Sequence, residues 1–187
     1  PPHRGHLAVA AAARSQLGLD RVLLVVANDP WKKSPGREIT PASDRLAMVQ
    51  ALIRGDDGQP IAGLEVSDAE IRRGGPSFTV TTLRELREAH TGAEFYLIIG
   101  RDLVDDFGSW HESSEIERLA TIVVVDRPGY VSDAKRGWKL LVVPPVDVSS
   151  TELRDRLRDG RDVSAHMTQA VVDEIHQRGL YGVGASA

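Results

Sequence analysis

The sequence predicts an α/β fold of the Rossmann-like, doubly wound type, with a parallel sheet of about five strands. Short apolar runs without alternation, which are typical of strands buried on both faces, alternate along the chain with helical patterns. The 187 residues suit one domain, and no linker or internal repeat divides residues 1–187. In such a fold, ligands bind at the carboxyl ends of the strands.

The first half of the chain predicts two helices and two strands in alternation. Thr40 as N-cap and Pro41 at the first helical position predict the start of the second helix, as Gly18 predicts the end of the first. Residues 28–36 form a loop between them. We expect these elements, in order, at residues 7–17 (helix), 21–26 (strand), 41–54 (helix) and 61–71 (strand or extended chain).

The second half continues the alternation and ends in helices. A loop at residues 72–78 leads into a helix that ends near His90. The remaining elements are expected at 94–100 (strand), 114–119 (helix), 121–125 and 140–143 (strands), and at 149–159 and 167–177 (helices). The helical part thus covers about 149–182, within the same domain.

The composition excludes several classes of function. Because the chain has no cysteine, it can form neither a disulfide nor a thiolate metal site. The formal charge is −4, and no run of Lys and Arg indicates binding to nucleic acid or to a membrane surface. No membrane-spanning run and no signal-peptide pattern is visible, so we expect a cytoplasmic protein.

Two histidines, His3 and His6, precede the first helix. Both imidazoles lie at a helix N-terminus, where backbone N–H groups lack partners and the helix dipole favours anions. The pattern indicates a phosphate site, although two ordinary surface histidines beside Gly5 would look the same. A phosphate site of this kind also needs a strand ahead of His3, so we expect the sequence given to begin just downstream of the first strand.

Of the other histidines, His166 and His176 have neither metal nor catalytic spacing.

A second anion site is indicated at residues 148–154. Ser149 and Glu152 form the capping-box pattern S-x-x-E, so a helix starts here and Arg154 projects from its first turns. Taken alone, this could equally be a capped helix with a solvent-facing arginine. Gly100 and Asp102 follow a buried strand, where α/β sheets contact ribose hydroxyls, although Asp102 could equally be a helix N-cap.

The two ends of the chain together resemble a known pair of motifs. His3-Arg4-Gly5-His6 resembles the (H/T)-x-G-H motif, and residues 148–154 resemble the I-S-S-T-x-x-R motif, of the nucleotidylyltransferase α/β-phosphodiesterase superfamily. Within it, the chain is most similar to the bacterial nicotinate-nucleotide adenylyltransferase family, through segments 73–79, 100–102, 109–111 and 127–129 in the right order. The family's G-x-F loop ahead of the first motif has no counterpart in the sequence given.

The resemblance implies transfer of AMP from ATP to nicotinate mononucleotide, which gives nicotinate adenine dinucleotide and pyrophosphate in NAD biosynthesis. It implies no covalent enzyme intermediate, and Mg²⁺ held mainly by ATP phosphates and water. The catalytic residues implied are His3, His6 and Arg154. ATP would be bound by these three together with Gly100, Asp102, Ser149, Ser150 and Thr151. The second substrate would be bound by Lys32, Thr79, Trp110 and Arg127, with Trp110 stacked on the pyridine ring.

Other functions remain open from the sequence. The acceptor could be nicotinamide mononucleotide or phosphopantetheine, since backbone groups that the side chains do not reveal decide between acid and amide. A nucleotide-binding module without catalysis is the alternative from a different class. The partners expected are therefore ATP and nicotinate mononucleotide, and a homo-oligomer is possible.

Overall fold

The structure is a computed structural model that describes residues 1–30, 39–126, 137–144 and 149–184. The chain forms two compact units, which are described one at a time. Unit 1 comprises Pro1–Asn28, Lys32–Arg73 and Val146–Ala187, and unit 2 comprises Asp29–Trp31 and Gly74–Pro145. All the strand pairs in these units are parallel and helices alternate with the strands, so the predicted α/β class is confirmed.

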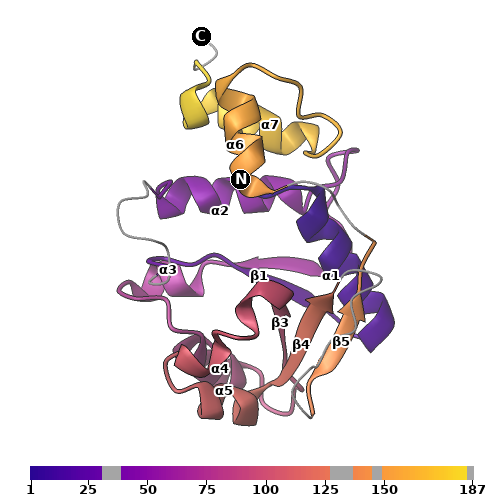
Figure 1. The fold of residues 1–187 in the computed structure, drawn as a ribbon, viewed down its shortest axis with the longest axis vertical. Coiled ribbons are helices and arrows are strands. Elements are labelled where there is room, and N and C mark those ends of the chain that lie inside the picture. Colours follow the sequence, from indigo (N-terminus) through magenta and orange to yellow (C-terminus); the bar gives the residue numbers. More distant parts are fainter. Residues whose placement is uncertain (31–38, 127–136, 145–148, 185–187) are drawn as a thin grey trace. The chain divides into compact units, whose positions relative to one another are not determined.

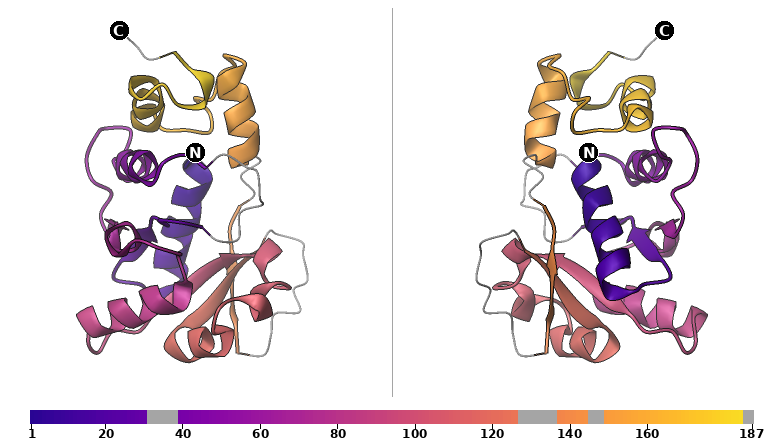
Figure 2. Two further views of the ribbon diagram at one scale, coloured as in Figure 1. Left: turned by 90° about the vertical axis from the view of Figure 1, so that its left-hand side faces the viewer. Right: turned by 90° about the vertical axis from the view of Figure 1, so that its right-hand side faces the viewer.

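Unit 1 consists of one parallel strand pair and the helices around it. Its elements are α1 (Arg4–Leu17), β1 (Val22–Val25), α2 (Ala42–Leu52), β2 (Leu64–Ser67), α3 (Ala69–Arg73), α6 (Ser150–Arg158), α7 (Gln169–Gln177) and the 3₁₀ turn η3 (Leu180–Gly182) (Figure 1). β1 pairs with β2 from Val22 opposite Leu64 to Val25 opposite Ser67. Helices α6 and α7 lie beside α2 (Figure 2), and Met48, Leu153 and Val171 are buried together where they meet. This packing fixes the start of α6, which carries the second predicted motif.

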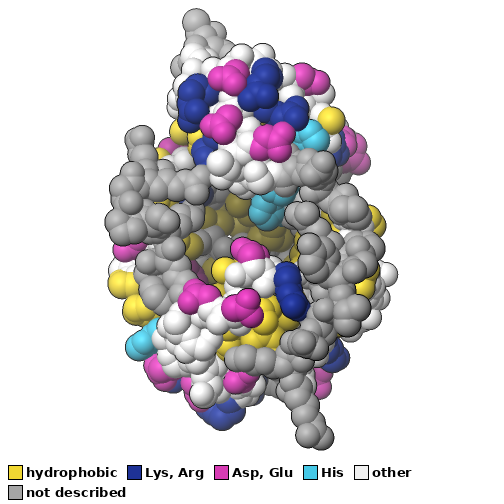
Figure 3. Space-filling view, in the orientation of Figure 1, with side chains coloured by type: hydrophobic (Ala, Val, Ile, Leu, Met, Phe, Trp, Pro, Cys, Tyr) yellow, Lys and Arg dark blue, Asp and Glu magenta, His cyan; other side chains and the backbone are white. Residues whose placement is uncertain are grey.

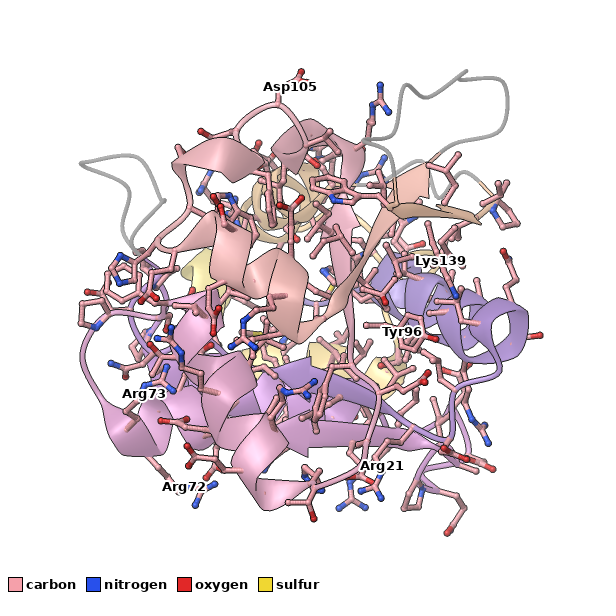
Figure 4. The ribbon with its side chains drawn as sticks, turned by 90° about the horizontal axis from the view of Figure 1, so that it is seen from below. Arg21, Arg72, Arg73, Tyr96, Asp105 and Lys139 are labelled. Atoms are coloured by element: carbon pink, nitrogen blue, oxygen red, sulfur yellow. The ribbon has the colours of Figure 1, made fainter. Side chains whose placement is uncertain are left out.

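Unit 2 is a three-stranded parallel sheet with helices on it. Its elements are α4 (Thr79–Ala89), β3 (Tyr96–Gly100), the 3₁₀ turns η1 (Arg101–Leu103) and η2 (Phe107–Ser109), α5 (Ser113–Leu119), β4 (Thr121–Asp126) and β5 (Lys139–Val142). The strand order is β3-β4-β5, and the core is built around the fully buried Phe107 and Ile116. Lys139 of β5 lies 4.9 Å from the centre of the Tyr96 ring of β3 (Figure 4). This cation–π contact links the two edge strands across β4.

The strands form two sheets, which corrects the expectation of one sheet with about five strands. β1 and β2 make one sheet, and β3, β4 and β5 make the other. Among the described residues, β1 pairs with β2 alone and β3 pairs with β4 alone. Within the same residues, no helix is long and apolar enough to cross a membrane.

Several element boundaries differ from those predicted, each for a local reason. Pro41 rather than Thr40 is the N-cap of α2, because the Thr40 hydroxyl instead donates to the Tyr181 hydroxyl at 3.2 Å. The predicted strand at 61–71 is strand only over Leu64–Ser67. It ends where Ser67 Oγ accepts a hydrogen bond from the Ala69 N–H and starts α3.

One buried hydroxyl in unit 1 lowers its stability. Thr168 is 1% exposed, and its Oγ1 finds no hydrogen-bond partner within the described part of the chain. It precedes α7 but makes no side-chain cap bond. We expect Thr168→Val to raise the free energy of unfolding by about 1 kcal/mol, because valine has the same shape without the unsatisfied group. Urea unfolding measures this.

The matched control is Thr82→Val. Thr82 is also buried, at 5% exposed, but its hydroxyl donates to the Phe78 carbonyl. This variant should lose stability, because a hydrogen bond is removed. Equal effects of the two substitutions would contradict the explanation for Thr168.

Candidate active site

Helix α1 begins in a reciprocal cap made by two histidines. The Gly5 N–H donates to His3 Nδ1 at 3.1 Å, and the His3 N–H donates to His6 Nδ1 at 3.2 Å. This is a capping box in which imidazoles replace the usual Ser/Thr and Glu/Gln side chains. It also explains why α1 begins at Arg4, three residues earlier than predicted.

The cap determines where each imidazole carries its proton. A nitrogen that accepts a hydrogen bond bears no proton, so both Nδ1 atoms are bare and each neutral ring carries its hydrogen on Nε2. The two rings lie edge to face with their centroids 4.1 Å apart. Two Nε2–H donors are therefore available beside a helix N-terminus, and both are held in place by the backbone.

Both rings are uncharged at neutral pH. Burial, together with the neighbouring His6, lowers the pKa of His3 to about 4. The pKa of His6 is also lowered, because surrounding protein excludes much of the water from its ring, although part of the side chain stays exposed. The site thus offers hydrogen-bond donors, and its electrostatic attraction for anions comes from the helix dipole.

This cap predicts a loss of stability in acid. The unfolded chain binds a proton at His3 below about pH 6.5, whereas the folded chain resists protonation down to about pH 4. The contribution of His3 is therefore complete above pH 6.5 and lost as the pH falls toward 4. We expect wild type to lose about 1 kcal/mol more than His3→Asn between pH 7.5 and 5, a value reduced for solvent screening at this partly exposed ring.

The measurement is urea unfolding at both pH values. Asparagine retains a capping oxygen but does not titrate. His90→Asn, at the end of α4, controls for the loss of any one histidine. If wild type and His3→Asn lose the same stability on acidification, the cap does not depend on a bare Nδ1.

The start of α6 meets the start of the chain. Ser150 Oγ donates to the Pro1 carbonyl at 2.9 Å, although the two residues are 149 positions apart. Ser149 caps α6 as predicted, with its Oγ accepting from the Glu152 N–H at 3.1 Å. The structure therefore brings the two predicted motifs together, and the N-termini of α1 and α6 lie near each other (Figure 2). Such an arrangement suits a polyanion such as a phosphate chain.

Arg154 differs from the arginines that follow it on α6. Its Nη2 donates to Thr151 Oγ1 at 3.0 Å, toward the helix start, and we find no ion pair between it and any residue that the structure describes. Arg156 and Arg158 instead pair with Glu152 and Asp155. Basic and acidic side chains accordingly intermingle over α6 and α7 (Figure 3). The guanidinium of Arg154 is the one on this helix that is placed to bind an anion near the N-terminus.

Four other predicted residues lie in unit 2. Gly100 ends β3 and Asp102 lies in the turn η1 that follows. A Cβ on Gly100 would come too close to the carboxylate of Asp102, so a larger residue here would displace that side chain. Thr79 is the first residue of α4, and Trp110 packs its ring 5.2 Å from that of Phe107. Lys32 and Arg127 lie outside the described residues.

Three residues beside the histidine cap were not predicted. Arg4 pairs with Asp56 through two hydrogen bonds, and its backbone N–H donates to the His166 carbonyl at 2.8 Å. The contribution of His166 is structural and comes from its main chain, because its carbonyl accepts the hydrogen bond that holds the first turn of α1. Sequence spacing could not reveal this contact, since its partners are more than 100 residues apart.

The chain is similar to one family along nearly its whole length. The cytidylyltransferase-like family matches residues 1–156. A Thermus thermophilus protein described as "probable nicotinate-nucleotide adenylyltransferase" is 41% identical over 182 residues, which cover 97% of this chain and 94% of that protein. A Gloeobacter violaceus protein with the same description is 38% identical over 199 residues, which cover 100% of this chain and 94% of that protein.

Solved structures resemble the fold. A Plasmodium falciparum nicotinic acid mononucleotide adenylyltransferase complexed with NaAD matches this chain with a TM-score of 0.77 and 18% identity. The match covers 100% of this chain and 94% of the chain of that structure. The same enzyme complexed with APC has a TM-score of 0.73, with the same identity and coverage. At this identity the likeness supports the architecture alone.

Proposed function

The chain belongs to the cytidylyltransferase-like family and, within it, to the nicotinate-nucleotide adenylyltransferases, and on this basis we propose how its residues carry out that reaction. The enzyme transfers AMP from ATP to nicotinate mononucleotide, as a step of NAD biosynthesis. The observation that carries this function is 41% identity over 97% of the chain. The histidine cap beside the start of α6 supplies the hydrogen-bond donors that a reaction between phosphate groups needs.

The reaction is a single in-line transfer. A phosphate oxygen of nicotinate mononucleotide attacks the α-phosphorus of ATP, and the bond from that phosphorus to the oxygen of the leaving pyrophosphate breaks. The products are nicotinate adenine dinucleotide and pyrophosphate. Such a reaction asks the protein mainly for positioning and for stabilisation of phosphate charge.

The histidines and α6 divide this work in our proposal. His6 Nε2–H donates to an α-phosphate oxygen as charge develops there, and His3 Nε2–H holds the triphosphate. Both donate without giving up a proton, since both rings are neutral with bare Nδ1 atoms. Arg154 and the N–H groups of Ser150 and Thr151 hold the β- and γ-phosphates, supported by the position of these residues at the start of α6.

Mg²⁺ is proposed as the metal cofactor. The residues that the structure describes contain no group of three or more His, Cys, Asp or Glu side chains that could hold a metal ion. ATP phosphates and water would therefore supply most of its ligands, and bound Mg²⁺ would neutralise phosphate charge.

The remaining assignments fall on Ser149 of unit 1, on residues of unit 2 and on two residues outside the described part. We propose that Gly100 and Asp102 bind the adenosine ribose, that Ser149 supports the phosphate site through its cap, and that Trp110 stacks on the pyridine ring. Thr79, Lys32 and Arg127 are proposed for the nicotinate mononucleotide. A cytoplasmic location and a homo-oligomer stay predictions from the sequence.

The test is the initial rate of pyrophosphate release with MgATP and each of three acceptors at equal concentration. We expect nicotinate mononucleotide to react fastest, with nicotinate adenine dinucleotide as the product. A faster rate with nicotinamide mononucleotide or phosphopantetheine would reassign the acceptor. Tight ATP binding without pyrophosphate release from any acceptor would favour a nucleotide-binding module.

A further inference from the structure

Arg4, which follows the first of the two cap histidines, is held by a side chain from a distant segment. Its Nη1 and Nη2 each lie 3.0 Å from one oxygen of Asp56, so the pair is bidentate. Asp56 itself lies in a closed turn after α2, where the Gly55 N–H donates to the Gln59 carbonyl at 2.8 Å. The hydrogen bonds from Arg4 lower the pKa of Asp56 from its usual value, which keeps the carboxylate ionised.

The main chain of Arg4 is held from another side. Its N–H donates to the His166 carbonyl at 2.8 Å. That carbonyl belongs to a turn in which the His166 and Met167 N–H groups both donate to the Val163 carbonyl. Met167 is 1% exposed and Val163 6%, so the turn is anchored in the core of unit 1. Arg4 is thus fixed at its backbone and at the far end of its side chain.

This double hold acts on the histidines through covalent geometry. Arg4 is bonded directly to His3 and to Gly5, and the Gly5 N–H is the donor to His3 Nδ1. Any rotation of Arg4 would therefore move the cap, and with it both Nε2–H groups. A shift of about 1 Å at such a position can cost a reaction about 100-fold in rate.

We propose that Asp56 is a positioning residue for the adenylyl transfer, which orients His3 and His6 by clamping Arg4. This inference rests on the proposed function. A purely stabilising role fits the pair less well, because the side chains of Arg4 and Asp56 are 39% and 60% exposed and exposed pairs add little to stability. Helix α1 also has its own caps at His3 and Gly18.

The experiment compares Asp56→Asn with wild type in steady-state kinetics. We expect kcat to fall about fivefold to tenfold, with a small change in KM for either substrate and no shift of the urea unfolding midpoint. Arg4→Gln should lower kcat by a similar factor, and the double variant should be no slower than either single one. Glu65→Gln is the matched control, because it breaks another exposed pair of unit 1, with Arg21; it should leave kcat unchanged.

A spectroscopic readout separates this inference from the proposed function. Long-range ¹H–¹⁵N correlations of the imidazole rings report which nitrogen carries the proton. We expect Asp56→Asn to alter the Nδ1 and Nε2 signals of His3 and His6, whether or not the enzyme turns over. If wild type releases no pyrophosphate, the proposed function fails while this readout still tests the clamp.

Three results would overturn the clamp. The first is an unchanged kcat and unchanged imidazole signals in Asp56→Asn. The second is a double variant whose loss equals the product of the single losses. The third is a low kcat in Arg4→Gln with full activity in Asp56→Asn, since Arg4 would then bind phosphate directly.

Discussion

We expect His6→Ala to lower kcat for pyrophosphate release by about 100-fold or more. The Nε2–H of His6 is proposed to meet the α-phosphate where charge develops, and loss of one such donor typically costs this much. The assay is steady-state turnover with MgATP and nicotinate mononucleotide. His176→Ala, in the last turn of α7, is the control and should retain wild-type kcat.

A second substitution separates chemistry from capping. His6→Ala also removes the acceptor of the His3 N–H, so part of its effect could come from a weakened helix start. Glutamine fits the third position of a capping box, so His6→Gln should recover the unfolding free energy while kcat stays well below wild type. If His6→Gln restores both, His6 acts only as a cap.

The local signals of the sequence predicted the elements of the site well. Gly18 in the left-handed conformation ends α1 as expected, with φ 66°, and Ser149 caps α6. Both features depend on residues within one helical turn of each other, which pattern rules describe. The histidine cap escaped the same reasoning, because imidazoles are not among the usual capping side chains, and the predicted start of α1 was three residues late.

Contacts over long distances in the sequence could not be predicted. Asp56 is 52 residues from Arg4, in a Gly/Asp turn whose composition indicates nothing beyond a turn. The His166 carbonyl is a backbone group, so no side-chain pattern marks it. The division of the strands into two sheets likewise depends on which edges pair, and buried apolar runs give no information on their neighbours in a sheet. The resemblance of the motifs, by contrast, predicted that the two ends of the chain meet. In the superfamily both motifs bind the same nucleotide, whereas the positions of residues 3–6 and 148–154 in the sequence do not by themselves indicate that they are close.

Arg154→Gln is expected to lower kcat/KM for ATP by about 100-fold. A guanidinium at the start of α6 would make charge-assisted hydrogen bonds to the β- and γ-phosphates, which become the leaving pyrophosphate, and glutamine keeps the length of the stem without the charge. Arg154→Lys should recover part of this loss, since it restores the charge but not the planar fork. Initial rates over a range of ATP concentrations measure both variants.

The matched control lies one turn further along the same helix. Arg158 pairs with Asp155 at 2.9 Å, so Arg158→Gln removes an equal charge from α6 without removing the guanidinium near its N-terminus, and it should leave kcat/KM close to wild type. If the two glutamine variants lose the same activity, the effect of Arg154 is that of net charge alone. A loss confined to Arg154→Gln would place its guanidinium on the phosphates of ATP, provided that binding of nicotinate mononucleotide is unchanged. The phosphate of the second substrate would then be excluded as the group that Arg154 binds.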